Sequence, residues 1–200
     1  MDGDTQKMYI VMVGLPAMGK STIAVRIKDS LLAEDTPAEV FNNGDLRRRM
    51  IPGNTSGADF YDPDNTEGAA LREKIARTNL ENARTFLREE GAIAILDATN
   101  VSRQRRLLVQ RVLSDHPVLF VECVNNDQEI LEASIARKAT LPEFRRFSFD
   151  QAVKSFHQRI AYYQEIYDPF SDERNHVLLD SLNNQILKIS LTDTLPYFDQ

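Results

Sequence analysis

The stretch Gly14-Leu15-Pro16-Ala17-Met18-Gly19-Lys20-Ser21 fits the phosphate-loop pattern Gly-x-x-x-x-Gly-Lys-Ser/Thr with no deviation. An apolar run at 8–13 precedes it, and apolar residues from Ile23 to Leu32 follow it at helical spacing. A strand that ends in a glycine-rich turn and opens a helix points backbone N–H groups, and the positive end of the helix dipole, at an anion. The stretch therefore predicts a nucleoside triphosphate site, with Lys20 on the outer phosphates and the Ser21 hydroxyl on Mg²⁺. A chance match in a glycine turn is the alternative, and the flanking strand and helix disfavour it.

Apolar runs and helical periodicities alternate along the rest of the chain. We expect strands at 8–13, 38–42, 92–96, 118–124, 176–182 and 186–191, and helices at 19–34, from Asp45, and at 66–90, 102–114, 127–138 and 150–166. This alternation indicates an α/β protein with a mainly parallel sheet and helices on both faces, the three-layer P-loop NTPase-type fold. Residues 52–65 show no periodicity and are expected to form a long functional loop. We expect a single domain over residues 1–200, of which 1–7 form a disordered leader.

The composition favours a cytoplasmic enzyme. The chain has 200 residues, and its net charge of −6 argues weakly against a protein that coats nucleic acid. With one cysteine, Cys123, it forms neither an internal disulfide nor a cysteine metal cage. No apolar run approaches the ~20 residues that span a bilayer, and the acidic N-terminus is unlike a secretory signal. We therefore expect no nucleic-acid and no membrane partner.

Asp97 follows a buried strand downstream of the phosphate loop. A carboxylate at that point can hold Mg²⁺ or its water shell, or accept the proton of an attacking hydroxyl. Thr99 and Asn100 follow on the same rim, where they could bind a polyhydroxyl substrate or simply form the turn. Because ligands of parallel sheets bind at the carboxyl ends of strands, we expect this segment, the phosphate loop and residues 43–49 to meet at one edge. The competing interpretation of Asp97 is a helix cap.

Basic residues are the second signal, because the planar fork of arginine suits phosphate oxygens. From their chemistry alone, each is as well explained by a surface charge as by a substrate phosphate; they are Arg47, Arg48, Arg49, Arg72, Arg103, Arg105, Arg106 and Arg159. Lys138 would add charge to the transferred phosphoryl group, or complement the dipole of the helix that it closes. The segment 143–147 could be a mobile lid or an ordinary loop. Tyr163 by its helical spacing suggests packing, and Cys123 suggests a core residue.

An ordered series of motifs gives the sequence a family resemblance. The series is Gly14–Ser21, Val40–Arg48, Phe60–Asn65, Leu96–Asn100 with Arg103 to Arg106, Phe120–Glu122, and Arg159–Tyr163. Together these segments resemble the kinase domain of 6-phosphofructo-2-kinase/fructose-2,6-bisphosphatase, from about Tyr9 to Pro169. The resemblance implies transfer of the ATP γ-phosphoryl group to the 2-hydroxyl of fructose 6-phosphate.

The resemblance also implies roles for individual residues. ATP would be held by Gly14, Leu15, Pro16, Ala17, Met18, Gly19, Lys20, Ser21, Thr22, Ala133 and Lys138. Mg²⁺ would be held by Ser21 and Asp97, and catalysis would rest on Lys20, Asp97 and Lys138. Fructose 6-phosphate would be held by Arg47, Arg72, Thr99, Arg105, Arg159 and Tyr163, which replaces the packing interpretation of Tyr163.

The sequence departs from the family pattern in places. Asn125 stands where the family commonly has a cysteine, and Thr140-Leu141-Pro142 replaces a Gly-Ser-Pro pattern after Lys138. The Arg-His-Gly motif of a histidine phosphatase is absent, so we expect no phosphatase activity from this chain. A phosphatase domain beyond residue 200 of a longer natural protein, and a homodimer, stay open at this point.

Two competing functions remain. A P-loop followed by an Asp-x-Thr-Asn strand end also resembles polynucleotide 5′-hydroxyl kinases, although the net charge of −6 and the absence of tryptophan disfavour a stacking nucleic-acid groove. A non-catalytic nucleotide-binding regulatory domain is the other alternative. The intact Lys20, Ser21 and Asp97 disfavour it.

Overall fold

The computed structural model describes residues 6–51, 53, 55–171 and 173–198. Its centre is a six-stranded sheet in the order β2-β3-β1-β4-β5-β6. The strands are β1 (Met8–Val13), β2 (Ala38–Asn42), β3 (Ile93–Asp97), β4 (Val118–Val124), β5 (His176–Asp180) and β6 (Gln185–Ser190). The first five pair in parallel, and β6 pairs antiparallel with β5. The predicted mainly parallel α/β sheet is therefore confirmed.

The helices lie close to their predicted positions. They are α1 (Lys20–Ala33), α2 (Asn43–Met50), α3 (Thr66–Arg88), α4 (Arg103–Val112), α5 (Gln128–Ala139) and α6 (Phe149–Glu165). Asn65 and Ser102 cap α3 and α4. Helix α2 begins before the predicted Asp45, because the Asn42 side chain accepts a hydrogen bond from the Asp45 amide. None of the helices in the described part of the chain is long and apolar enough to cross a membrane.

The described part of the long loop before α3 is more ordered than its sequence suggested, while residues 52 and 54 of this loop lie outside the described residues. Residues Ala58–Tyr61 form a short 3₁₀ helix, η1, and both Phe60 and Tyr61 are buried. A second 3₁₀ helix, η2 (Pro142–Phe144), lies in the connector between α5 and α6. Of the predicted leader, residues 1–5 lie outside the described residues, and Lys7 donates to the Leu87 carbonyl.

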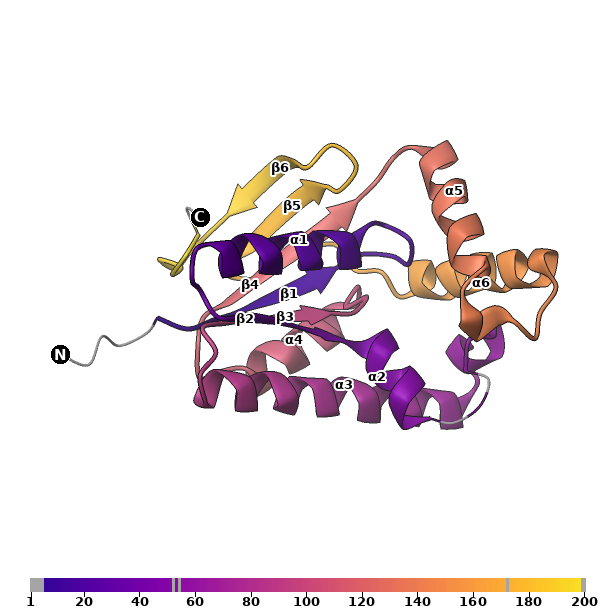
Figure 1. Ribbon diagram of the computed structural model, residues 1–200, viewed down its shortest axis with the longest axis horizontal. Coiled ribbons are helices and arrows are strands. Elements are labelled where there is room, and N and C mark those ends of the chain that lie inside the picture. Colours follow the sequence, from indigo (N-terminus) through magenta and orange to yellow (C-terminus); the bar gives the residue numbers. More distant parts are fainter. Residues whose placement is uncertain (1–5, 52, 54, 172, 199–200) are drawn as a thin grey trace.

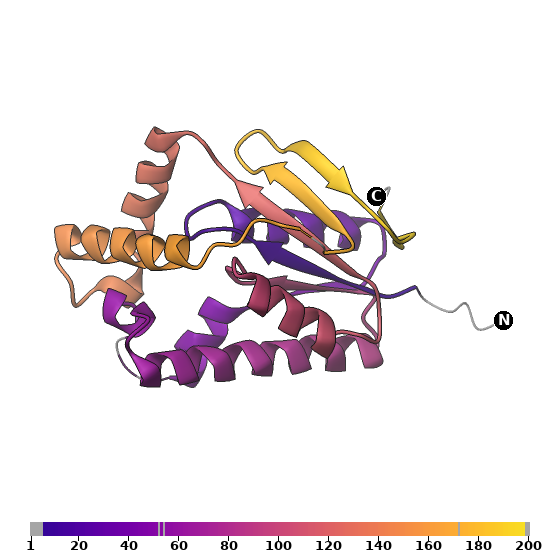
Figure 2. The same cartoon turned by 180° about the vertical axis from the view of Figure 1, so that it is seen from behind.

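The strand β1 is buried along its whole length and gives side chains to both faces of the sheet. On one face Met8, Ile10 and Met12 pack with residues of α1. On the other face Tyr9, Val11 and Val13 pack with residues of α3 and α4. Figure 1 shows α1 in front of the sheet, and Figure 2 shows α4 in front when the molecule is seen from behind. These are the three layers that the alternating pattern predicts.

The carboxyl ends of the parallel strands share one edge of the sheet. In register, Asn42 at the end of β2 pairs with Asp97 at the end of β3. Helices α5 and α6 lie beyond this edge, on the side to which the parallel strands point (Figure 1). A third apolar cluster ties these two helices to the phosphate loop through Ala17. The chain therefore surrounds the edge where an α/β protein binds its ligand.

Candidate active site

The phosphate loop connects β1 to α1 in a conformation that the glycines permit. Gly14 has φ of 142°, and a Cβ there would lie 2.6 Å from the Cys123 carbonyl oxygen. Gly19 has φ of 78° and precedes the first turn of α1. A side chain at either position would be strained, and at Gly14 it would also collide with backbone. The loop is thereby held close to the end of β4.

Neighbouring segments hold the loop in place through its backbone. The Gly14 amide donates to the Thr99 carbonyl at 2.9 Å, and the Asn100 side chain donates to the Met12 carbonyl at 2.9 Å. From the turn after β5, the Ser181 hydroxyl lies 2.8 Å from the Met18 carbonyl. Asn100 is buried with φ of 48°, so the structure supports its interpretation as a turn former.

Lys20 lies in the hollow of the loop. Its ammonium donates to the Leu15 carbonyl at 2.7 Å, and the residue is 8% exposed. Burial lowers the pKa of Lys20 to about 8, with Arg159 and Lys138 adding to the decrease and Asp97 opposing it. A desolvated ammonium held in this way is well placed to meet the negative charge of phosphate oxygens.

Asp97 is oriented by a residue that sequence reasoning did not single out. The Asn42 side-chain amide donates to Asp97 Oδ2 at 2.5 Å, while its own oxygen caps α2. Asp97 is buried and lines the same cavity as Ser21. A serine hydroxyl and a carboxylate are hard oxygen ligands of the kind that Mg²⁺ takes. The donor set therefore fits this metal.

Three of the predicted arginines gather around one aromatic ring. The guanidinium carbon of Arg159 lies 4.0 Å from the ring centre of Tyr61, and those of Arg47 and Arg72 both lie 5.9 Å from it. Tyr163 packs against the same ring, with 6.1 Å between the ring centres. Helices α2, α3 and α6 thus converge on η1, although their sequence positions are far apart.

Arg47 is held in this cluster by a carboxylate of the connector. The guanidinium pairs with Glu143 and donates to the Tyr61 hydroxyl, and Arg47 is 3% exposed. Glu143 also pairs with Arg48 at 3.0 Å and accepts from the Ser56 hydroxyl at 2.7 Å. Burial alone would raise the pKa of the Glu143 carboxyl, but Arg47, Ser56 and Arg48 outweigh it and hold that pKa below its ordinary 4.5.

This pairing leads to a prediction on stability. Replacing Glu143 with glutamine is expected to lower the free energy of unfolding by about 2 kcal/mol near neutral pH, because hydrogen bonds to charged groups contribute roughly that much. A carboxyl whose pKa is lower in the folded than in the unfolded protein stabilises the fold at pH values above its unfolded pKa. That contribution is lost as the pH falls through its folded pKa. The difference between E143Q and wild type should therefore shrink below about pH 4.5. Urea unfolding on both sides of that pH, with the exposed Glu90→Gln as control, measures it, and a constant difference would contradict the pairing.

Arg72 and Arg105 also have hydrogen-bond partners beside the cavity. Arg72 donates to the Phe60 carbonyl, and Arg105 donates to Glu73 at 2.5 Å. Three guanidinium nitrogens of cavity-lining arginines are buried and find no hydrogen-bond partner among the described residues: Arg47 Nε, Arg105 NH1 and Arg159 Nε. Buried donors without an acceptor are costly, so these groups are suited to an anionic ligand.

Lys138 lies in the last turn of α5 and lines the cavity. Burial lowers its pKa, and the nearby Arg159 and Arg137 lower it further. Ala133 is exposed on α5 and is not among the cavity-lining residues, and neither are Gly14 and Leu15, whose contribution is to the backbone of the loop.

A cavity of about 640 Å³ joins these groups. Its volume is within the range of small-molecule sites. The predicted site residues that line it are Pro16, Ala17, Met18, Gly19, Lys20, Ser21, Thr22, Arg47, Arg72, Asp97, Thr99, Arg105, Lys138, Arg159 and Tyr163. The phosphate loop, the carboxylate and the arginine cluster thus share one space.

Other side chains from segments discussed in the sequence pack or form hydrogen bonds within the protein. Cys123 is buried in β4, where burial raises the pKa of its thiol to about 12, so it is a core residue as expected. The connector at 143–147 is packed through Phe144, which is 3% exposed and contacts Phe147 and Phe156. Tyr162 donates to Asp62 at 3.0 Å.

The interpretation of the sequence gave no individual role to four residues of the site: Asn42, Tyr61, Glu143 and Ser181. A faint signal existed for Tyr61, because it lies in the long loop that was expected to be functional. Glu143 lay in the segment considered as a lid. For Ser181 no pattern in the sequence pointed to the phosphate loop, since the contact depends on the pairing of β5 with β4.

Comparison with known proteins gives concordant matches. A model of the 6-phosphofructo-2-kinase family matches residues 1–191. Over 168 residues the chain is 35% identical to 6-phosphofructo-2-kinase/fructose-2,6-bisphosphatase 1 of Rattus norvegicus, covering 82% of this chain and 35% of that one. Over 177 residues it is 34% identical to 6-phosphofructo-2-kinase 1 of Saccharomyces cerevisiae, covering 84% of this chain and 21% of that one. The chain thus spans about a third or less of the length of these relatives.

Solved structures agree on the fold. The crystal structure of APE1195 matches with a TM-score of 0.57 and 22% identity, over 90% of this chain and 88% of that chain. A chain of the PezAT toxin–antitoxin system of Streptococcus pneumoniae matches with a TM-score of 0.54 and 14% identity, over 98% of this chain and 76% of that chain. At these identities the likeness concerns the fold alone.

Proposed function

Because the chain belongs to the 6-phosphofructo-2-kinase family, we propose that it transfers the γ-phosphoryl group of ATP to the 2-hydroxyl of fructose 6-phosphate, which gives fructose 2,6-bisphosphate. The observation that carries the proposal is the single cavity that joins a phosphate loop to a cluster of arginines. One end suits a nucleoside triphosphate and the other suits a second, smaller phosphate compound. A single kinase domain with ATP and Mg²⁺ as its cofactors follows from this proposal.

On the donor side, the loop amides and Lys20 hold the β- and γ-phosphates, and Ser21 and Asp97 hold Mg²⁺. The metal supplies neutralisation of the charge that develops on the transferred group. Lys138 approaches from α5 and adds a second ammonium. Little covalent chemistry is required of the protein, since positioning and charge provide most of the catalysis in phosphoryl transfer.

On the acceptor side, Arg47, Arg72, Arg105 and Arg159 supply the donors for the 6-phosphate, with Thr99 and Tyr163 for the sugar. The 2-hydroxyl oxygen forms a bond to the γ-phosphorus, and the bond between that phosphorus and the β,γ-bridging oxygen breaks to release ADP. The hydroxyl proton leaves in the same reaction, and Asp97 is the carboxylate on the rim that can accept it.

A panel of acceptors tests the proposal. ADP release is measured with ATP and Mg²⁺ and either fructose 6-phosphate, fructose, or a 5′-hydroxyl oligonucleotide. We expect turnover with fructose 6-phosphate and a much lower rate with fructose, which lacks the phosphate. Turnover with the oligonucleotide instead would point to the polynucleotide-kinase alternative, and ATP binding without any turnover would point to a regulatory domain.

Arg159 provides a test of the acceptor side. Replacing it with alanine is expected to raise the KM for fructose 6-phosphate about 10- to 100-fold, because charge-assisted hydrogen bonds contribute roughly 1.5–3 kcal/mol. The KM for ATP should change by less than about twofold. Steady-state kinetics with each substrate varied in turn measures both values. Lys154→Ala, an exposed position of the same helix, is the matched control, and an equal rise in both KM values would mean that Arg159 is structural.

We also propose a cytoplasmic location, which the composition favours. The last part of the proposal is a homodimer that forms through β6. The edge strand β6 exposes Ile186, Leu187 and Ile189, which lie on both of its faces. An edge strand with apolar side chains is a template for pairing with a second chain, so a second copy of β6 is the partner that we expect there. Light scattering of wild type and of Ile189→Lys tests it, since the charge should shift a dimer to monomer.

A further inference from the structure

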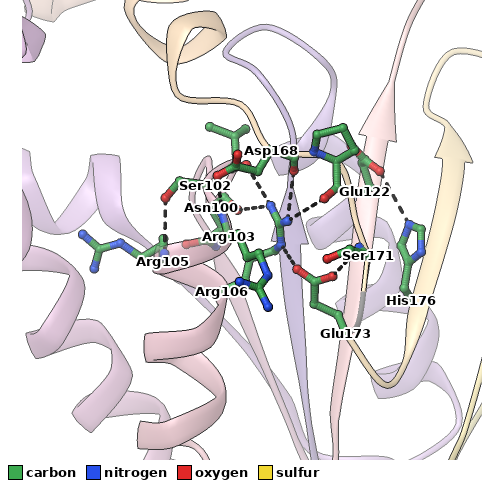
Figure 3. Close-up of polar contacts among 12 residues, drawn as sticks. Asn100, Ser102, Arg103, Arg105, Arg106, Glu122, Asp168, Ser171, Glu173 and His176 are labelled. Atoms are coloured by element: carbon green, nitrogen blue, oxygen red, sulfur yellow. Dashed lines mark hydrogen bonds and ion pairs between the residues drawn. The ribbon is translucent and has the colours of Figure 1, made fainter.

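Arg106 has surroundings unlike those of Arg105, the residue before it in α4. Whereas Arg105 lines the cavity, the Arg106 side chain is completely buried behind it. Successive helical residues point about 100° apart, so adjacent arginines of one helix can face a ligand and the protein interior. Figure 3 shows Arg106 between the segment that follows β3 and the segment that follows α6.

All five N–H donors of Arg106 are used inside the protein. Nε donates to Glu173 at 2.6 Å. NH1 donates to the carbonyls of Val101 at 2.7 Å and Asn100 at 3.4 Å, and NH2 to those of Asp168 at 2.9 Å and Pro169 at 3.3 Å. A guanidinium has five N–H groups and cannot lose its charge. Arg106 therefore has no donor left for a substrate, and it acts on the site through the backbone segments that it joins.

The two segments are also joined directly. The Asp168 amide donates to the Val101 carbonyl at 3.0 Å, and the Asp168 carboxylate accepts from the Arg103 amide at 2.9 Å. On the first segment, Val101 lies two residues after Thr99. On the second, Asp168 lies five residues after Tyr163. Each segment thus leads, within a few residues, to a side chain of the proposed sugar phosphate site.

Partners on the far side hold the guanidinium in its position. Its carbon lies 4.3 Å from the ring centre of Phe170, which stacks on His176 with 3.9 Å between ring centres. Glu173 accepts from the Ser171 amide at 2.9 Å as well as from Arg106. Burial alone would raise the pKa of Glu173, but the Ser171 amide and Arg106 outweigh it and lower that pKa. The carboxylate is thus charged at neutral pH and balances the buried cation.

From these contacts we infer that Arg106 is a positioning residue for the acceptor. It fixes the end of α6, which carries Arg159 and Tyr163, against the turn that carries Thr99. This inference rests on the proposed function, since the site that it positions is the fructose 6-phosphate site. The planar fork is essential, because it reaches carbonyls of two segments at once, whereas a lysine ammonium has three donors on one atom.

Arg106→Lys is the decisive variant, and Glu173→Gln is the milder one. A displacement of about 1 Å can lower the rate of a reaction about 100-fold. Because Arg106 positions groups that hold fructose 6-phosphate, we expect R106K to raise the KM for this substrate about tenfold or more. The KM for ATP should stay within about threefold. E173Q should change the same parameter in the same direction by a smaller factor. Arg111→Lys, exposed on the same helix, is the control and should leave both KM values unchanged.

Two further measurements separate positioning from a general loss of structure. The R106K/Y163F double variant should lose less than the product of the single losses, because on this inference Arg106 acts by positioning Tyr163. Hydrogen exchange should quicken at the Asp168 amide in R106K, and it should stay unchanged in the strands β1 and β3. Multiplicative losses, or faster exchange throughout the sheet, would overturn the inference.

The outcomes also distinguish this inference from the proposed function. A wild type that does not turn over fructose 6-phosphate would overturn the proposed function and the inference with it. An active wild type, with R106K that changes both KM values equally or neither, would overturn the inference alone. If R106K does not fold, E173Q carries the test, and failure of both to fold would show that the pair serves folding instead of positioning.

Discussion

Replacing Lys20 with methionine is expected to lower kcat about 100- to 1,000-fold. The Lys20 ammonium is buried in the hollow of the phosphate loop, where it has exchanged water for a carbonyl oxygen of its own loop. A buried ammonium of this kind attracts a phosphate oxygen more strongly than it would in water. Removal of one such preorganised donor typically lowers kcat about 100- to 1,000-fold. Methionine keeps the length and apolar body of the side chain, so the fold should survive. Single-turnover transfer from ATP to fructose 6-phosphate measures the effect.

Lys28→Met is the matched control for Lys20→Met. Lys28 lies on the same helix, away from the loop, and pairs with Glu39 at 3.5 Å near the surface. We expect its kcat to lie within about twofold of wild type, because exposed pairs contribute little. A K20M variant that keeps more than a tenth of the wild-type kcat would contradict the role of Lys20 in transfer.

Replacing Asp97 with asparagine is the second large expected effect. We expect kcat to fall about 100- to 1,000-fold, since the change removes both a metal ligand of the proposed site and the group that can accept the hydroxyl proton. Asparagine has nearly the same shape, and its oxygen can still accept the hydrogen bond from Asn42. The loss would therefore report charge instead of packing. Asp29→Asn, exposed on α1, is the control.

The magnesium dependence of the Asp97 variant separates its two proposed roles. If Asp97 mainly holds the metal, a higher Mg²⁺ concentration should restore part of the lost kcat. If it mainly accepts the proton, kcat should stay low at every Mg²⁺ concentration. A variant with wild-type kcat at ordinary Mg²⁺ would exclude both roles. The helix-cap interpretation of Asp97 is already wrong, because Ser102 caps α4.

The parts of the site that depend on local sequence were predictable. The glycines, the lysine and the serine of the phosphate loop are close together in the sequence, so the sequence pattern predicts the geometry of the loop. The meeting of Asp97 with this loop followed from a general rule, because both lie at carboxyl ends of parallel strands. Spacing alone suggested these two elements, and the family resemblance then added the acceptor.

Residue chemistry could not predict which arginines line the cavity and which are buried in the protein. Arg105 and Arg106 are adjacent and identical in type, yet one lines the cavity and the other is buried among carbonyls. Which of them faces the ligand depends on how α4 is rotated against α3 and the segment after α6. That rotation is set by tertiary packing, which a single sequence does not display. The same reason hid Tyr61, whose importance arises from the three helices that meet around it.

Contacts between segments that are far apart in the sequence could likewise not be predicted. Ser181 reaches the Met18 carbonyl across more than a hundred residues of chain, and Asn42 reaches Asp97 through the pairing of β2 with β3. A polar residue in a turn or at a strand end has many ordinary explanations. These contacts follow from strand order, which the alternation of elements suggests as a class and not in detail.

In the proposed reaction, ATP and fructose 6-phosphate bind in this cavity, and the γ-phosphoryl group passes to the 2-hydroxyl. Phosphorus NMR of the reaction of ATP, Mg²⁺ and fructose 6-phosphate with the wild-type chain tests it most directly. We expect the loss of the ATP signals, the appearance of ADP, and a new phosphate resonance of fructose 2,6-bisphosphate in equal amount to the ADP. Formation of inorganic phosphate alone, or of a sugar phosphorylated at another position, would contradict it.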